Sequence, residues 1–250
     1  MFPFFTLVLV LLLSGCSHQK TAKVNVPPPP AIESESIPDV TPQAKPKQPQ
    51  EPAATEEEEV IGVAANAKPI FSETGLASWY GPPYHNRRGS NGEIYNMNAL
   101  TAAHRTVPLG SICRVTNVKT GHSTLVRITD RGPFIRGRVL DLSLAAAKKI
   151  DLWKAGVARV KLEVLTSPLP LQTGGRWAVQ IGGFDDSKSA ADLADHLSRR
   201  YHTAQVLKFA SPTGAWWIRV RVRDDDKQRA EEVARATATP EGAVFLVRLD

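Results

Sequence analysis

Short runs in which apolar and polar residues alternate occupy the middle of the chain, residues 75–166. Such alternation, with glycine or asparagine at the ends of each run, is typical of β-strands. The strands that the pattern predicts are residues 76–80, 111–118, 123–129 and 157–165. Residues 142–152 predict a helix, because alanine and lysine favour helices and Asp141 or Ser143 can cap it. Many short strands with one helix predict a small, mainly β, closed barrel.

The last part of the chain, residues 174–250, mixes strand patterns with helix patterns. Its predicted strands are residues 177–184, 204–209, 216–222 and 243–249. One helix follows the first strand, with Ser187 or Ser189 as its cap, and a second helix around Ala230 and Val233 precedes the last strand. The order β-α-β-β-α-β predicts a ferredoxin-like α+β domain, joined to the barrel by a linker of residues 167–173.

Alternation along these strands also predicts which side chains face the helices. Val179 and Ile181 fall on the covered face, and the polar and aromatic residues between them fall on the open face. The open face is expected to carry Gln180, Trp217, Arg219 and Arg221. It is either a platform that binds sugars or a solvated sheet surface.

The N-terminus has the pattern of an exported lipoprotein. An apolar run at residues 4–13, too short to span a membrane, leads into Leu13-Ser14-Gly15-Cys16, which resembles a lipobox. Residues 1–15 are then a signal peptide and Cys16 is the lipidated first residue; the alternative is an ordinary secretory signal with an incidental cysteine. Residues 16–74 are rich in proline and glutamate and predict a disordered tether.

Charge narrows the class of partner. The chain has a net charge of +6, and residues 75–165 hold fourteen Lys and Arg against five Asp and Glu. A basic surface suits a polyanion, and outside the cytoplasm that polyanion is the cell wall rather than nucleic acid. The spacing of His and Cys predicts no metal site, no cofactor is expected, and Cys113 is expected to be a small buried apolar residue.

The few carboxylates of the middle region lie beside turn signals, where side chains can reach a shared cleft. The candidates for proton transfer are Glu93, Asp130 and Asp141, with His104 between them. Each also has a structural alternative: Asp130 as a turn residue, Asp141 as a helix cap, and His104 as a structural histidine.

Several motifs occur in order through the middle region: residues 77–81, 91–93, 101–110, 114–117, 130–134 and 138–143. Together they resemble the rare lipoprotein A (RlpA) family. The resemblance implies a double-psi β-barrel and a lytic transglycosylase that cleaves peptidoglycan glycan strands and leaves 1,6-anhydro-muramoyl ends. Glu93, His104 and Asp130 fall on that family's active-site positions. Asn96 replaces a frequent aspartate, so it can hydrogen-bond a sugar but cannot titrate.

The two halves of the α+β domain, around residues 179–184 and 218–222, resemble a SPOR domain. That resemblance implies binding to septal peptidoglycan stripped of its stem peptides. Arg223-Asp224 stands where the family commonly has Gly-Pro-Phe. With a lipid anchor, the expected location is the outer membrane, facing the periplasm and enriched at the division septum, with the division machinery as a candidate partner.

A lytic transglycosylase needs few titrating groups, because the C6 hydroxyl of the substrate attacks its own anomeric carbon. We expect Asp130 to act as acid and then as base, Glu93 to stabilise the oxocarbenium-like centre, and His104 to hydrogen-bond Glu93 or the sugar. Trp79 and Tyr80 could stack on sugars, although alternation places one of them in the core. The other functions considered are a wall-binding protein without catalysis and a structural tether between outer membrane and wall.

Overall fold

The computed structural model describes residues 67–239 and 241–250. The predicted signal peptide, Cys16 and all but the end of the predicted tether lie outside these residues. The described part contains a closed barrel and a four-stranded sheet with helices, which confirms both predicted fold classes. Among the described residues, no helix combines the length and the apolar character that a membrane crossing requires.

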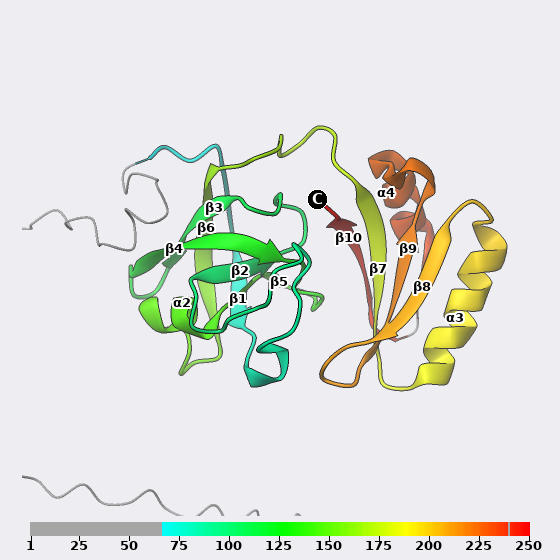
Figure 1. Ribbon diagram of the computed structural model, residues 1–250, viewed down its shortest axis with the longest axis horizontal. Helices are drawn as coiled ribbons and strands as arrows, with labels where there is room; N and C mark the ends of the chain where they lie inside the picture. Colours follow the sequence, from blue (N-terminus) through cyan, green and yellow to red (C-terminus); the bar gives the residue numbers. More distant parts are fainter. Residues whose placement is uncertain (1–66, 240) are drawn as a thin grey trace, which may run out of the picture. The chain divides into compact units, whose positions relative to one another are not determined.

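Six strands close the barrel in the order β1-β5-β2-β4-β3-β6 (Figure 1). They are β1 (Phe71–Trp79), β2 (Thr101–His104), β3 (Ile112–Asn117), β4 (Ser123–Asp130), β5 (Arg138–Leu142) and β6 (Val157–Thr166). The β1/β5 and β2/β4 pairs are parallel, and the other neighbours are antiparallel. This mixture brings β4 and β5 to the two sides of the short strand β2.

Alternation along the strands fills the barrel interior, as the sequence predicts. β3 buries Cys113 and Val115 completely, and β4 does the same with Val126 and Ile128. A fully buried aliphatic side chain contributes about 1.5–3 kcal/mol. Burial also raises the pKa of the Cys113 thiol, so it stays a neutral apolar group.

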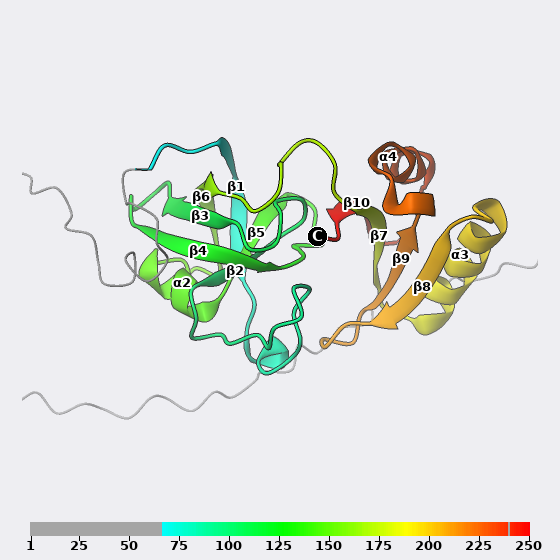
Figure 2. The ribbon, with the colours of Figure 1, turned by 45° about the horizontal axis from the view of Figure 1, so that its top comes forward.

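The structure differs from the prediction in several places around the barrel. β2 and β5 were not predicted as strands, and β1 begins at Phe71, ahead of the strand predicted at residues 76–80. The helix α2 (Leu144–Lys149) is shorter than expected and packs against β1, β4 and β5 (Figure 2). Its cap is Ser143, whose hydroxyl accepts a hydrogen bond from the Ala146 amide at 3.2 Å. Asp141 lies in β5, so the expectation that it might cap the helix is wrong.

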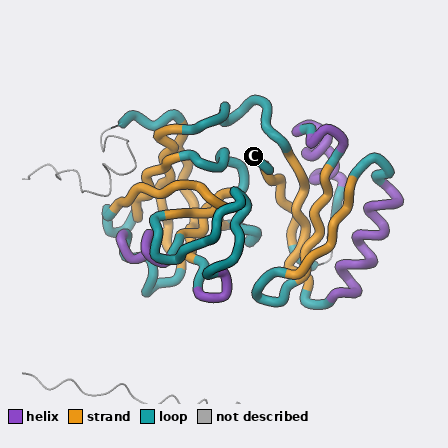
Figure 3. The backbone as a smooth tube through the Cα atoms, viewed as in Figure 1, coloured by secondary structure: helices purple, strands orange, loops and turns teal. Residues whose placement is uncertain are grey.

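Residues 80–100, between β1 and β2, are almost entirely loop apart from the 3₁₀ turn η1 (Pro82–Tyr84) (Figure 3). The loop folds back on itself through an isolated bridge between Arg88 and Ile94. The Gly89 amide also donates to the Glu93 carbonyl at 2.8 Å. These backbone bonds give the loop a defined shape beside the barrel.

The second domain has the predicted β-α-β-β-α-β order, with all neighbouring strands antiparallel in the order β10-β7-β9-β8. Its elements are β7 (Trp177–Phe184), α3 (Ser187–Arg200), β8 (Gln205–Ala210), β9 (Trp216–Arg221), η2 (Arg223–Asp225), α4 (Lys227–Ala236) and β10 (Ala243–Arg248). Both long helices lie on the same face of the sheet (Figure 1). The residues expected on that face, Val179 and Ile181, are fully buried, which confirms the predicted sidedness.

Both long helices begin at an aspartate. Asp186 caps α3 by accepting hydrogen bonds from the amides of Lys188 and Ser189, at 2.7 and 2.8 Å. The prediction that Ser187 or Ser189 would be this cap is therefore wrong. Asp226 caps α4 in the same way, through the Arg229 amide at 2.9 Å. A side-chain cap of this kind stabilises a helix by about 1 kcal/mol.

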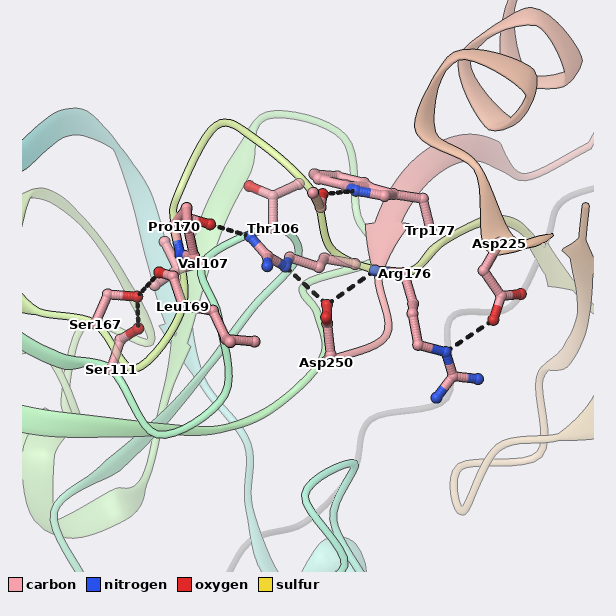
Figure 4. A network of polar contacts seen from close by, with 12 residues as sticks. Thr106, Val107, Ser111, Ser167, Leu169, Pro170, Arg176, Trp177, Asp225 and Asp250 are labelled. Carbon is pink, nitrogen blue, oxygen red and sulfur yellow. Dashed lines mark hydrogen bonds and ion pairs between the residues drawn. The ribbon is translucent and has the colours of Figure 1, made fainter.

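Ion pairs fasten the ends of β7, β9 and β10. Asp225 binds Arg176 at 2.9 Å and Arg221 at 2.7 Å, and its pKa is lowered chiefly by the hydrogen bond from Arg221. Asp250 accepts hydrogen bonds from the Arg176 amide and from Arg248 Nε (Figure 4). The guanidinium of Arg221 is therefore engaged in holding η2, rather than free on the open face.

Candidate functional site

Two carboxylates flank one small residue at the end of β2. Ala103 pairs with Asp130 of β4 on one side and with Asp141 of β5 on the other. Because neighbouring strands lie about 4.8 Å apart, the Cα atoms of the two aspartates are about 10 Å apart. Asp130, Asp141 and Ala103 all line the same cleft. The short side chain of Ala103 leaves the space between the carboxylates open.

Asp130 lies at the C-terminal end of β4, beneath the loop of residues 80–100. Its Oδ1 accepts hydrogen bonds from the Ser90 amide at 2.9 Å, the Ser90 hydroxyl at 2.5 Å and the Arg131 amide at 2.8 Å. Three donors on one oxygen fix the position of this carboxyl group. The hydrogen bonds from the Ser90 and Arg131 amides fit the alternative in which Asp130 is a turn residue, but Asp130 also faces the cleft.

Asp141 has a different environment. Burial raises the pKa of its carboxyl group, and the nearby charge of Asp130 adds to that rise. The Ser78 hydroxyl donates to Asp141 Oδ1, and Arg138 Nη1 donates in turn to that hydroxyl at 2.8 Å. These contacts and the charge of Arg105 oppose the effect of burial without cancelling it. Asp141 therefore keeps its proton to a higher pH than an ordinary aspartate.

Three tyrosines form one wall of the cleft: Tyr80, Tyr84 and Tyr95. The Tyr80 ring lies 5.9 Å from that of Tyr84, edge to face, and 4.3 Å from that of Tyr95. Burial raises the pKa values of Tyr80 and Tyr95, so their hydroxyls stay neutral. Of these three tyrosines, only Tyr80 was predicted to contact the substrate. The sequence signal that points to Tyr84 is the turn motif Tyr80-Gly-Pro-Pro-Tyr84.

Trp79 was predicted as a substrate contact, and the structure places it elsewhere. Its ring packs against the barrel core, and its indole N–H donates to the Trp153 carbonyl at 3.2 Å. Trp79 and Tyr80 are consecutive, so alternation sends their side chains to opposite sides. Trp79 is the core member of this pair, and Tyr80 is the cleft member.

The sheet face opposite the helices brings together most of the residues predicted for the open face, although Gln180 is buried there, with 2% of its surface exposed. Gln180 pairs with Arg219 across β7 and β9, and Arg219 Nε donates to Gln180 Oε1 at 2.9 Å. The Arg219 guanidinium also lies over the Phe209 ring, 5.5 Å from its centre. Trp217 lies against Gly182, where an added Cβ would come within 2.7 Å of the ring. Phe209 was not predicted to lie on this face, because its strand β8 shows little alternation.

In comparison with known proteins, each of the two domains matches a family model. Residues 72–162 match the family model described as lytic transglycolase, and residues 173–243 match the SPOR domain model. "Endolytic peptidoglycan transglycosylase RlpA" of Vibrio cholerae is 41% identical over 173 residues, 66% of each chain. The protein of the same name from Campylobacter jejuni is 40% identical over 164 residues, 56% of this chain and 60% of that one. The chain belongs to the RlpA family.

The matches span at most 66% of these two RlpA relatives. Over the barrel alone the identity is higher. The RlpA of Neisseria meningitidis serogroup A is 54% identical over 93 residues, 37% of this chain and 39% of that one.

Of the three predicted RlpA active-site residues, only Asp130 lines the cleft. In the described part of the chain no contact joins Glu93 to His104 or Asp130. Both oxygens of Glu93 accept hydrogen bonds from Arg127 of β4, at 2.9 and 2.8 Å. That pairing lowers the pKa of Glu93 and so keeps the carboxylate ionised. Glu93 is a clamp between the loop and β4, outside the lining of the cleft.

His104 is buried and does not reach the cleft lining. Its Nε2 lies 2.6 Å from Glu73 Oε1, and its Nδ1 accepts hydrogen bonds from the amides of Thr106 and Val107. The expected hydrogen bond from His104 to Glu93 or to a sugar is therefore not available. Glu73 was missed because the domain was expected to start at Gly75.

Asn96 was expected to hydrogen-bond a sugar. It is exposed, and its Oδ1 accepts a hydrogen bond from the Asn98 amide at 2.9 Å, in a turn of the loop. The structure thus gives Asn96 a local backbone role. Within residues 67–239 and 241–250, no group of three or more His, Cys, Asp or Glu side chains is placed to hold a metal ion.

Proposed function

We propose that this chain is a peptidoglycan lytic transglycosylase, which cleaves glycan strands and leaves 1,6-anhydro-muramoyl ends. The observation that carries the proposal is a pair of carboxylates in one tyrosine-lined cleft, one half-buried with a raised pKa and one held by three donors. Two carboxyl groups in unlike environments can divide the work of proton donor and stabilising anion.

The proposed reaction starts with Asp141 protonated. Asp141 gives its proton to the glycosidic oxygen, the bond to the anomeric carbon breaks, and Asp130 stabilises the oxocarbenium-like centre by its negative charge. The C6 hydroxyl of the same sugar then attacks the anomeric carbon, and its proton returns to Asp141. This assignment differs from the roles expected from sequence: the acid–base role moves from Asp130 to Asp141, whose pKa is raised by burial, and the stabilising role moves from Glu93 to Asp130.

The second domain supports a targeting role. Gln180, Trp217, Arg219 and Phe209 supply amide, guanidinium and aromatic groups on one sheet face, and these are the groups that bind sugars by hydrogen bonding and stacking. In this proposal the domain holds septal glycan. A lipid on Cys16 and a tether up to about residue 74 would place the barrel in the periplasm at the outer membrane.

Digestion of purified sacculi tests the proposal. The wild-type protein is expected to release anhydro-muropeptides, detected by mass spectrometry. Asp130→Asn and Asp141→Asn are expected to lose at least about 100-fold in rate while still pelleting with sacculi. Pelleting without any product from the wild type would favour the wall-binding alternative instead.

A further inference from the structure

The pair of buried His104 and half-buried Glu73 lies beside the catalytic cleft, on the other side of β2. His104 follows Ala103 in the strand, so its side chain points away from the cleft that Ala103 lines. Burial lowers the pKa of His104, and the partners of its ring agree with a neutral imidazole. Two backbone N–H groups point at Nδ1, so the single ring proton is on Nε2 and is donated to Glu73.

Glu73 is the matching half of this pair. Burial alone would raise the pKa of its carboxyl group, but the hydrogen bond from His104, helped by the positive charge of Arg105, outweighs burial and lowers it. An ionised Glu73 and an N–H of His104 form a charge-assisted hydrogen bond, with 2.6 Å between Oε1 and Nε2. Both ring nitrogens of His104 are thus used inside the protein.

The turn held by His104 is fastened to the loop between the two catalytic aspartates. Arg131, at the start of that loop, donates through Nη1 to the carbonyls of His104 and Val107, at 3.1 and 2.6 Å. In the opposite direction, Arg105 Nη1 donates to the carbonyls of Pro133 and Arg138, at 3.0 and 2.6 Å. Each arginine therefore holds the backbone of the other segment.

The clasp formed by these hydrogen bonds of Arg105 and Arg131 lies next to both carboxylates, Asp130 and Asp141. Asp130 immediately precedes the loop and accepts from the Arg131 amide. Asp141 lies in β5, the strand in which the loop ends. A shift in residues 104–107 would move Arg131 and Arg105, and with them the distance between the two aspartates.

We propose that Glu73 and His104 are positioning residues, which fix the turn at residues 104–107 and through its clasp the spacing of Asp130 and Asp141. They exchange no proton with the substrate. This inference rests on the proposed function, because it explains how the same cleft is held ready for cleavage.

Two amide substitutions separate positioning from proton transfer, since neither can titrate. In His104→Asn, the Oδ1 atom can take the place of Nδ1 and accept from Thr106 and Val107. In His104→Gln, the longer amide can reach Glu73 but leaves those two amides without an acceptor. Both changes are made in a Glu73→Gln background, so that no unpaired half-buried carboxylate remains.

In sacculus digestion we expect His104→Asn to keep kcat within about tenfold of the background. His104→Gln should lose about 100-fold in kcat, because a small displacement of catalytic groups costs that much, with KM little changed. The Glu73→Gln background itself should stay within about threefold of wild type, because a glutamine oxygen still accepts from Nε2.

Melting temperature and pelleting with sacculi show whether each variant is folded. Equal loss in both folded His104 variants, down to the level of Asp130→Asn, would overturn the inference and make His104 a proton-transfer group. Full activity in both would overturn it as well, since the clasp would then be unnecessary. If His104→Gln does not fold, the Glu73→Gln result decides alone, and a loss of about 100-fold there contradicts the inference. A wild type without anhydro products would instead reject the proposed function.

Discussion

At the scale of single residues, Asp141 combines a raised pKa with a place in the cleft. Its folded pKa lies above the ordinary value of 3.8, so its ionised form costs stability as the pH rises through the folded pKa. A titratable side chain whose ionised form is disfavoured by the fold in this way is typical of a functional site.

Asp141→Asn should therefore raise the melting temperature at neutral pH while abolishing cleavage. The amide has the same shape, can still accept from Ser78, and carries no charge to bury. Thermal unfolding at pH 7.5 measures this, with Asp130→Asn as the matched control that removes a carboxylate held by three donors. A lower melting temperature for Asp141→Asn than for wild type would contradict this reading of its environment.

Ser78 should set the upper end of the pH range of activity. Only protonated Asp141 can donate, so the rate is expected to fall as pH rises through its pKa. The Ser78 hydroxyl stabilises the ionised form, so Ser78→Ala raises that pKa further and should move the falling limb to higher pH. A pH–rate profile from pH 4 to 9 tests this. The control is Ser90→Ala, which removes a hydrogen bond to Asp130, and its falling limb should not move to higher pH. A limb that moves down in Ser78→Ala is incompatible with Asp141 as the donor.

At the scale of elements, the ion pair of Glu93 and Arg127 fastens the loop of residues 80–100 to β4. Both side chains are partly exposed, so the pair is expected to contribute only about 0.2–1 kcal/mol to stability. Its effect should appear in activity, since the same loop carries Ser90, the partner of Asp130.

Glu93→Arg and Arg127→Glu should each lower the rate of sacculus digestion by about tenfold, and the double exchange should restore most of it because the pair can form in reverse. Digestion rates of the four proteins give the coupling directly. No recovery in the double variant, with the fold intact, would mean that Glu93 acts chemically, as the sequence alone suggested.

The elements also show where sequence reasoning works and where it stops. β3 alternates clearly and was predicted, as were β4 and the whole order of the second domain. β2 has all four residues buried and two are alanines, so it has no alternating pattern. β5 is only five residues long. Pairing of β2 with β4 and β5 joins residues far apart in the chain, so the neighbourhood of Asp130 and Asp141 could not be derived from spacing.

At the scale of the whole molecule, cleavage and wall binding should be separable. The double variant Phe209→Ala and Arg219→Ala removes an aromatic ring and the guanidinium over it from the open sheet face. We expect it to pellet with sacculi at least about tenfold more weakly, with unchanged turnover of soluble glycan strands, since stacking contributes about 1 kcal/mol or more per contact. Arg199→Ala, on the exposed side of α3, is the charge-matched control and should bind normally. Equal weakening by the control would point to charge alone rather than to the sheet face.

The most direct measurement of the central claim is digestion of sacculi in water enriched in oxygen-18, followed by mass spectrometry of the new sugar ends. If the sugar hydroxyl attacks its own anomeric carbon while Asp141 gives and takes back one proton, the products have anhydro ends and contain no heavy oxygen. These anhydro products should disappear with Asp141→Asn. Reducing ends that contain oxygen-18 would show that water is the nucleophile, and would contradict the account.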